Sequence, residues 1–195
     1  MNEENIKQEE QNFSFNDYWP SIGIVGAIFS LISFVAGLFF GYQQINSEPT
    51  GSFFSPIMLS GVIVCLVTSL AGLLAVWHFT REVSPKLKLG QGAVIGFLTG
   101  AVIVVISVIL NELWIMLVDP EYTQKIMEST IANIEAMDMP QSAKDDMIDA
   151  MAESIEQSQS FLRQIFWGVP ITGLLNLITG LIGVKLFAEK EEETF

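Results

Sequence analysis

AVIGFLTGAVIVVISVIL, residues 93–110, is a run of 18 residues without a charge. A helix through it would be apolar on every side, since the stretch 101–106 contains no polar residue. Because an α-helix rises about 1.5 Å per residue, about 20 residues cross a hydrocarbon core of roughly 30 Å. A further apolar stretch reaches Val118, so this run predicts a helix that crosses a membrane.

Three more uncharged runs are long enough to cross a membrane: 21 residues in 22–42, 23 in 57–79 and 20 in 165–184. In a soluble four-helix bundle each helix would need a polar stripe toward water, and segments such as 62–67 have none. The sequence therefore predicts an all-α fold, an integral membrane four-helix bundle. We expect its spans at about 20–42, 57–79, 92–118 and 165–187.

The composition agrees with a membrane protein and excludes other classes. Half of the 195 residues are apolar and 16% are charged, with a mean hydropathy of +0.46, which is too apolar for a water-soluble globule. Nine Lys and Arg against 22 Asp and Glu give a net charge of −13, which argues against a nucleic-acid partner. One Cys and one His exclude an internal disulfide and a multi-histidine metal site, and we expect no cofactor and no metal.

The Lys and Arg residues predict the orientation of the chain. The connection 43–56 has none, whereas 80–90 has three, and four crossings place 80–90 and both tails on one side. Positively charged connections stay in the cytoplasm, so we expect both termini there. Residues 1–18 then form an acidic cytoplasmic tail and 188–195 a second tail, around a four-span membrane domain, 19–187. The five acids and single lysine of 1–18 favour a retained first span over a cleaved signal peptide.

The longest connection, 119–160, is an acidic helical insert within the membrane domain. Asp119-Pro120 is typical of a helix start, and Pro140 of a second one, with apolar residues at helical spacing after each. We therefore expect an amphipathic helical hairpin between the third and fourth spans, outside the cytoplasm. Its carboxylates form either a surface for a cation or cationic partner or a solvated face, since no calcium-hand loop is present. The ten carboxylates are Asp119, Glu121, Glu128, Glu135, Asp138, Asp145, Asp146, Asp149, Glu153 and Glu156.

Small and polar residues inside the spans indicate where helices pack. Gly92, Gly96 and Gly100 recur every four residues and line one side of the third span, where another backbone can approach closely. Asn111 falls on the same side. If the third and fourth spans run antiparallel, Asn111 and Thr172 lie at similar depth, where they are placed to share a hydrogen bond.

Two further polar residues within spans are candidates for function. Glu112 is the one carboxylate in a span, so it could carry a proton or bind a cation; alternatively it reaches the interface and pairs with Arg163. Asn176, near the middle of the fourth span, is expected to donate a hydrogen bond to another helix. No nucleophile and base pair, phosphate cradle or metal spacing accompanies them.

The order of the motifs resembles a known family. Lys88-Leu89-Gly90-Gln91 leads into the glycine-spaced third span and Asp119-Pro120-Glu121-Tyr122 leaves it, before the methionine-rich acidic insert and a glycine-rich last span. Over roughly 19–187 the chain resembles an uncharacterised family of small bacterial four-helix membrane proteins, a domain of unknown function. The resemblance implies that architecture and a location in the bacterial envelope, here the inner membrane, and it supplies no site residues.

Three functions are compatible with this architecture. The first is a non-enzymatic structural or interaction protein of the lipid bilayer, which packs as a homo-oligomer or with a membrane protein partner and presents the acidic hairpin. The second is a subunit of a small oligomeric transporter or channel, with Asn111, Glu112 and Asn176 facing a shared cavity. The third, a membrane enzyme, would need clustered catalytic groups that the sequence lacks, so we expect no enzymatic activity.

Overall fold

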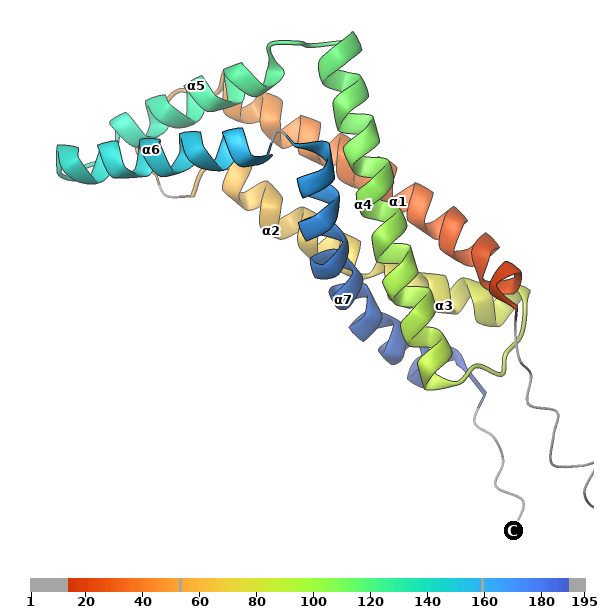
Figure 1. Cartoon of the computed structure of the whole chain (residues 1–195). Helices are drawn as coiled ribbons and strands as arrows, with labels where there is room; N and C mark the ends of the chain where they lie inside the picture. Colours follow the sequence, from red (N-terminus) through yellow and green to blue (C-terminus); the bar gives the residue numbers. More distant parts are fainter. Residues whose placement is uncertain (1–13, 53, 159, 190–195) are drawn as a thin grey trace, which may run out of the picture.

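The protein is helical, without a strand, in the part of the chain that the computed structural model describes, residues 14–52, 54–158 and 160–189 (Figure 1). This confirms the predicted all-α class. Most of the two predicted tails, 1–13 and 190–195, lies outside the described residues. The helices are α1 (Phe15–Asn46), α2 (Pro56–Ser69), α3 (Ala71–Glu82), α4 (Leu89–Leu117), α5 (Tyr122–Glu135), α6 (Gln141–Ser158) and α7 (Phe161–Phe187).

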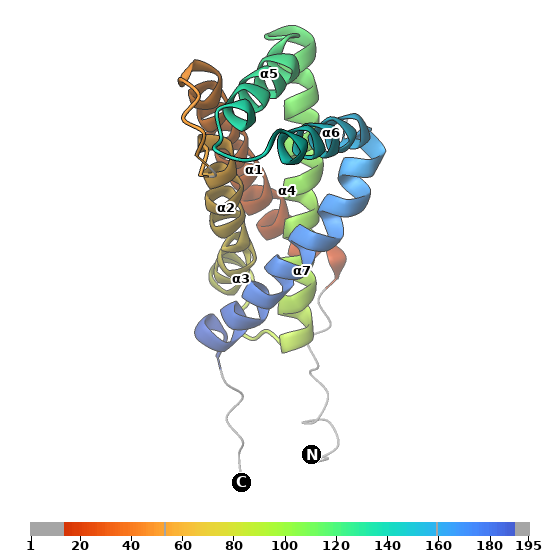
Figure 2. The same cartoon turned by 90° about the vertical axis from the view of Figure 1, so that its left-hand side faces the viewer.

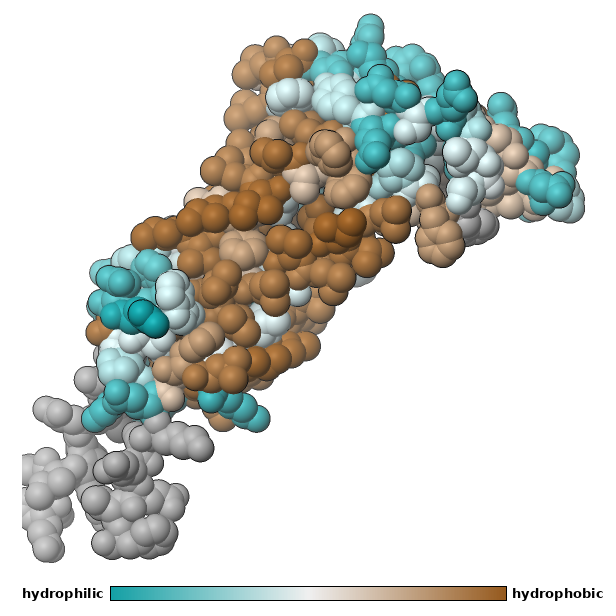
Figure 3. Space-filling view, turned by 180° about the vertical axis from the view of Figure 1, so that it is seen from behind, coloured by the Kyte–Doolittle hydropathy of each residue, from teal (hydrophilic) through white to brown (hydrophobic). Residues whose placement is uncertain are grey.

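Four helical stretches are long and apolar enough to cross a membrane: α1, α2 together with α3, α4, and α7. Figure 3 shows a broad apolar belt between two polar ends of the molecule. Side chains of these helices such as Val35, Phe39 and Phe166 are 62%, 63% and 71% exposed, as expected for a surface that contacts lipid. The predicted number of apolar spans is confirmed in length and composition.

The central pair of the bundle is α4 and α7, which pack along each other, while α1 packs on α4 and α3 contacts both. The largest fully buried apolar side chains are Phe79, Ile22, Ile95 and Val76. They come from the first half of α1, from α3 and from the start of α4, so the core lies toward one end of the bundle. Figure 2 shows this end opposite to α5 and α6.

We call that end the tail end, because the described chain begins and finishes there. The Tyr18 and Phe79 rings contact each other with centroids 5.4 Å apart, and the Glu189 N–H donates to the Pro85 carbonyl (2.9 Å). The start of α1 is thereby joined to α3, and the chain just after α7 to the connection between α3 and α4. These are the segments that the positive charges predict to share one side of the membrane.

The second span is not one continuous helix, as the sequence suggested, but breaks at Leu70 into α2 and α3. The Thr68 hydroxyl donates to the Val64 carbonyl (2.7 Å) and the Ser69 hydroxyl to the Leu66 carbonyl (2.8 Å). Side chains that bond back to their own helix in this way bend it. Ser30 and Thr99 make the same bond inside α1 and α4, which continue past them, so the Thr68-Ser69 pair marks the break without causing it alone.

The helices α5 and α6 lie at the other end of the bundle, which we call the insert end; they meet at the turn that joins them and diverge from it (Figure 1, Figure 2). They project sideways from the spans as a pair, and α5 also packs on α1. The turn between them contains Pro140, at which the sequence predicted the second helix to start.

Candidate functional site

One carboxylate, Asp119, ties the insert end to the spans. From the end of α1 the Tyr42 hydroxyl donates to Asp119 Oδ2 (2.7 Å), and from α5 Lys125 Nζ donates to Oδ1 (3.0 Å). The hydrogen bonds from Tyr42 and Lys125 hold the pKa of the Asp119 carboxyl below its ordinary value. The hydrogen bond to Asp119 raises the pKa of Lys125 in turn. Both groups are therefore charged at neutral pH and link α1 to α5.

The position of Asp119 corrects the expectation that this residue begins the next helix. The helix α5 begins at Tyr122, with Glu121 as its N-cap, because the Asp119 carboxylate is occupied by other partners. The Tyr122 ring lies against the Tyr42 ring, with centroids 5.3 Å apart. Its hydroxyl touches Gly41 so closely that a Cβ there would overlap it. The insert is thus packed on the end of α1, not only attached through its turns.

A buried asparagine on α5, Asn133, holds the loop between α1 and α2. Its Oδ1 accepts hydrogen bonds from the backbone N–H groups of Thr50 (3.2 Å) and Gly51 (3.1 Å), and its Nδ2 donates to the Ser52 carbonyl (2.9 Å). Gly51 has a φ of +65°, a backbone conformation that favours glycine. It also lies so close to the Ala136 carbonyl that a Cβ would overlap it. One side chain therefore satisfies three backbone groups of a distant loop.

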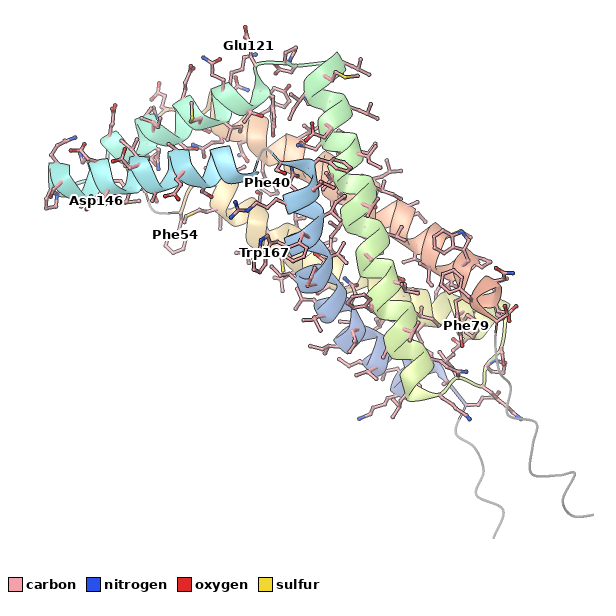
Figure 4. All side chains as sticks on the ribbon, viewed as in Figure 1. Phe40, Phe54, Phe79, Glu121, Asp146 and Trp167 are labelled. Atoms are coloured by element: carbon pink, nitrogen blue, oxygen red, sulfur yellow. The ribbon has the colours of Figure 1, made fainter. Side chains whose placement is uncertain are left out.

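The pair of α5 and α6 carries a net negative surface. Both of its lysines are engaged, since Lys125 pairs with Asp119 and Glu121, and Lys144 Nζ donates to the Glu135 backbone carbonyl (2.6 Å). In Figure 4, Glu121 lies near the root of the pair and Asp146 toward its far tip. The carboxylate residues that are exposed are Glu121, Glu128, Glu135, Asp138, Asp145, Asp146, Asp149 and Glu153.

These carboxylates do not converge on a metal. Among the described residues there is no group of three or more His, Cys, Asp or Glu side chains that could hold a metal ion. Hard cations need several oxygen ligands at one point, and here the carboxylates are spread along two helices. The surface can attract positive charge over its length, but it is not a coordination site.

The predicted glycine side of the third span faces α7. A Cβ at Gly96 would overlap the Asn176 carbonyl, and one at Gly100 would lie 2.7 Å from the Thr172 carbonyl oxygen. Gly92 likewise lies against α7. The backbones of α4 and α7 therefore touch directly along a line of small residues, the packing typical of helices in membranes.

The register of this contact shows that the predicted hydrogen bond between Asn111 and Thr172 is wrong. Thr172 lies opposite Gly100, and Asn111 is about three turns, or roughly 16 Å, further along α4. No hydrogen bond joins Asn111 to Thr172 in the described part of the chain. The prediction assumed that the two spans end at the same depth in the membrane. The contacts at the glycines instead align Gly100 of α4 with Thr172 of α7.

Asn176 joins α7 to the break between α2 and α3. It is 0% exposed; its Oδ1 accepts from the Gly72 N–H (2.7 Å) and its Nδ2 donates to the Thr172 carbonyl (2.9 Å) in its own helix. The first N–H groups of a helix have no partner inside that helix, and Asn176 supplies one at the start of α3. Across helices it accepts a hydrogen bond, instead of donating one as the sequence suggested. Its role here is structural.

An open cavity of about 650 Å³ lies between α1, α2, α4 and α7, on the insert side of the core. Of the three residues considered for a transport path, only Asn111 lines it. Glu112 is half-buried, and no hydrogen bond or ion pair reaches it within the described ranges, so the expected pairing with Arg163 is not found. The structure therefore does not bring Asn111, Glu112 and Asn176 together.

Sequence reasoning missed Asn133 and the partners of Asp119. Asn133 lies beside Ile134 on the buried face of an amphipathic helix, where a polar residue is a signal for a specific hydrogen bond. The pairing of Asp119 with Tyr42 had no local signal, since 77 residues separate the two.

Four apolar spans, a glycine contact between two of them and a break in a third span that one of these two satisfies are features typical of a multi-pass membrane protein. More narrowly, the chain belongs to the family described as Protein of unknown function (DUF4199), whose model matches residues 21–185. The resemblance to an uncharacterised family is thereby confirmed. No curated protein and no solved structure matches the chain.

Proposed function

We propose that this is a non-enzymatic interaction protein of the inner membrane, which presents the α5–α6 pair outside the cytoplasm to a partner that carries positive charge. The observation that carries the proposal is the exposed surface of the pair, on which acidic side chains outnumber the two lysines. Complementary charge gives specificity and speeds association more than it adds affinity.

The attachment of the pair supports this function. The Asn133 contacts with the first loop and the Asp119 contacts with Tyr42 and Lys125 fix α5 on the spans. A recognition surface on a fixed support loses less conformational entropy on binding than a flexible one. The helix α6, on which Asp145, Asp146 and Asp149 are exposed, is thereby held in place for a partner.

The orientation rests on the positive charges. Arg81, Lys86 and Lys88 lie at the tail end, so the positive-inside rule assigns that end to the cytoplasm and the insert end to the other side. Protease added to sealed cells is expected to cut the α5–α6 pair and to spare the connection between α3 and α4. The reverse pattern would refute the orientation.

The partner is tested by charge reversal in the full-length protein, purified from native membranes in mild detergent. We expect a stoichiometric membrane partner that is lost in the triple variant Asp145→Lys, Asp146→Lys, Asp149→Lys and in about 0.5 M salt, where charges are screened. The control Glu82→Lys reverses an exposed charge at the tail end and should keep the partner. Equal binding by both variants, or no stoichiometric partner, would refute the proposed function.

A further inference from the structure

The cavity between α1, α2, α4 and α7 is free of charge. None of the residues that line it within the described chain is Asp, Glu, Lys, Arg or His. Its volume of about 650 Å³ is in the range of pockets that enclose a small organic ligand, about 300–1,000 Å³. Because it lies among four spans and its lining offers no counter-charge, an uncharged molecule from the bilayer suits it.

Several polar side chains of the lining have unused hydrogen-bonding capacity. Ser107 Oγ is buried with no partner, and no hydrogen bond reaches the side chains of Asn111, Gln164 or Thr172 in the described part of the chain. By contrast, the hydroxyls of Ser60 and Thr68 each donate to a carbonyl of their own helix at 2.7 Å. An unpaired buried polar group is costly at membrane depth, so Ser107 needs a partner that the protein does not supply. The half-buried side chains of Asn111 and Gln164 are free to bond to the same ligand.

Polar groups of the lining lie both near the insert end and deeper in the cavity. Asn111 lies about 9 Å from the end of α4 and Gln164 about 5 Å from the start of α7, so both are near the insert end. Ser107 lies about 15 Å from the end of α4 and Thr172 about 16 Å from the start of α7, beside the apolar Val104 and Leu175. The cavity therefore combines an outer hydrogen-bonding part with a deeper part that is mainly apolar, which suits a molecule with a hydroxyl-bearing end and a hydrocarbon chain.

We propose that this cavity binds a neutral single-chain lipid of the monoacylglycerol class. Its hydroxyls and ester carbonyl would meet Asn111, Gln164 and Ser107, and its acyl chain would lie in the deeper, mainly apolar part. An ionised fatty acid or a phospholipid head would bury a charge without a counter-charge, and a hydrocarbon would leave the polar groups unpaired. The proposal does not depend on the function proposed for the α5–α6 pair.

The test uses the full-length protein in phosphatidylcholine nanodiscs with a monoacylglycerol that carries a photoreactive diazirine in its chain. Crosslinks are expected in the cavity segments 57–68 and 103–111, and unlabelled monooleoylglycerol should compete while oleate and lysophosphatidylcholine should not. A Cβ at Gly61 would meet nothing within 4 Å, so Gly61→Leu fills the cavity without a clash at that atom. Gly23→Leu is the matched control, since Gly23 has equal space and does not line the cavity.

We expect Gly61→Leu to lower the specific crosslinking at least about tenfold and Gly23→Leu to keep it within about twofold. If Gly61→Leu does not accumulate, Gly37→Leu replaces it, because Gly37 lines the same cavity and has the same free space. Crosslinks spread over the lipid-facing side of α1, equal competition by lysophosphatidylcholine, or unchanged labelling in both cavity variants would overturn the proposal. An absence of crosslinks in the cavity segments of the unaltered protein would overturn it as well.

Discussion

Replacing Asn176 by Leu should separate α3 from α7 at the point where the second span is broken. Asn176 is fully buried and its Oδ1 accepts the Gly72 N–H at 2.7 Å, in the first turn of α3. Leu has a similar size but no acceptor, so the variant leaves a buried N–H group without a partner. The second hydrogen bond, to the Thr172 carbonyl, matters less because that carbonyl lies inside a helix.

The expected magnitude follows from that unpaired group. A buried donor left without a partner costs about 1–3 kcal/mol, which lowers the folding equilibrium constant about 5- to 150-fold. An average interhelical hydrogen bond in a membrane protein contributes only about 0.6 kcal/mol. We expect Asn176→Leu to exceed that average because the helix break gives the Gly72 N–H no acceptor within α3.

The assay is reversible unfolding of the full-length protein in mixed micelles of increasing denaturing detergent, followed by tryptophan fluorescence and circular dichroism. The control is Thr172→Val, one turn earlier on α7, whose side-chain hydroxyl has no hydrogen bond in the described part of the chain. If Asn176→Leu loses no more than Thr172→Val, or less than about 0.5 kcal/mol, the account of the break is refuted.

Three further variants test other contacts. Gly96→Ala should push α4 and α7 apart and cost about 1–3 kcal/mol in the same unfolding assay, while Gly23→Ala, with free space, should not; equal effects would contradict the backbone contact. Asn133→Ala should release the loop between α1 and α2, which limited proteolysis would detect as faster cleavage there, whereas the exposed Asn46→Ala should change little. The pKa of Asp119 lies below its ordinary 3.8, so its contribution is complete above that pH and is lost only as the pH falls further. A stability scan from about pH 7 to 3 should show this acid transition, and Asp119→Asn should remove it; a transition near neutral pH would contradict the assignment.

The four spans could be predicted because a membrane imposes one length on every helix that crosses it. The side of α4 that faces α7 was also accessible, since Gly92, Gly96 and Gly100 recur at the helical period. The register between α4 and α7 could not be predicted, because it depends on which carbonyl of α7 fits opposite each glycine of α4. That is why Thr172 was matched with Asn111 instead of Gly100.

The contacts at the insert end were inaccessible for a different reason. Asn133 meets a loop 81 to 83 residues away, and Tyr42 meets Asp119 across 77 residues. Neither pairing follows from the spacing of residues along one helix. Gly51 in the loop and the polar Asn133 on a buried helix face indicate only that each has a specific role, not that they meet. Thr68-Ser69 mark the place of the break at Leu70, but the acceptor that satisfies the start of α3 comes from α7 and has no signal in that stretch.

The position of the core has a consequence for how the bundle moves. Its fully buried apolar side chains gather at the tail end, whereas the half toward α5 and α6 contains the cavity. Local opening of a protein is easiest where fewest apolar contacts must be given up. Amide hydrogens of α3 and the start of α4 should therefore exchange slowest, and the outer half of α2 should part from α7 while the opposite half stays assembled. Such uneven stability gives a lipid molecule a lateral route between helices without unfolding of the whole domain.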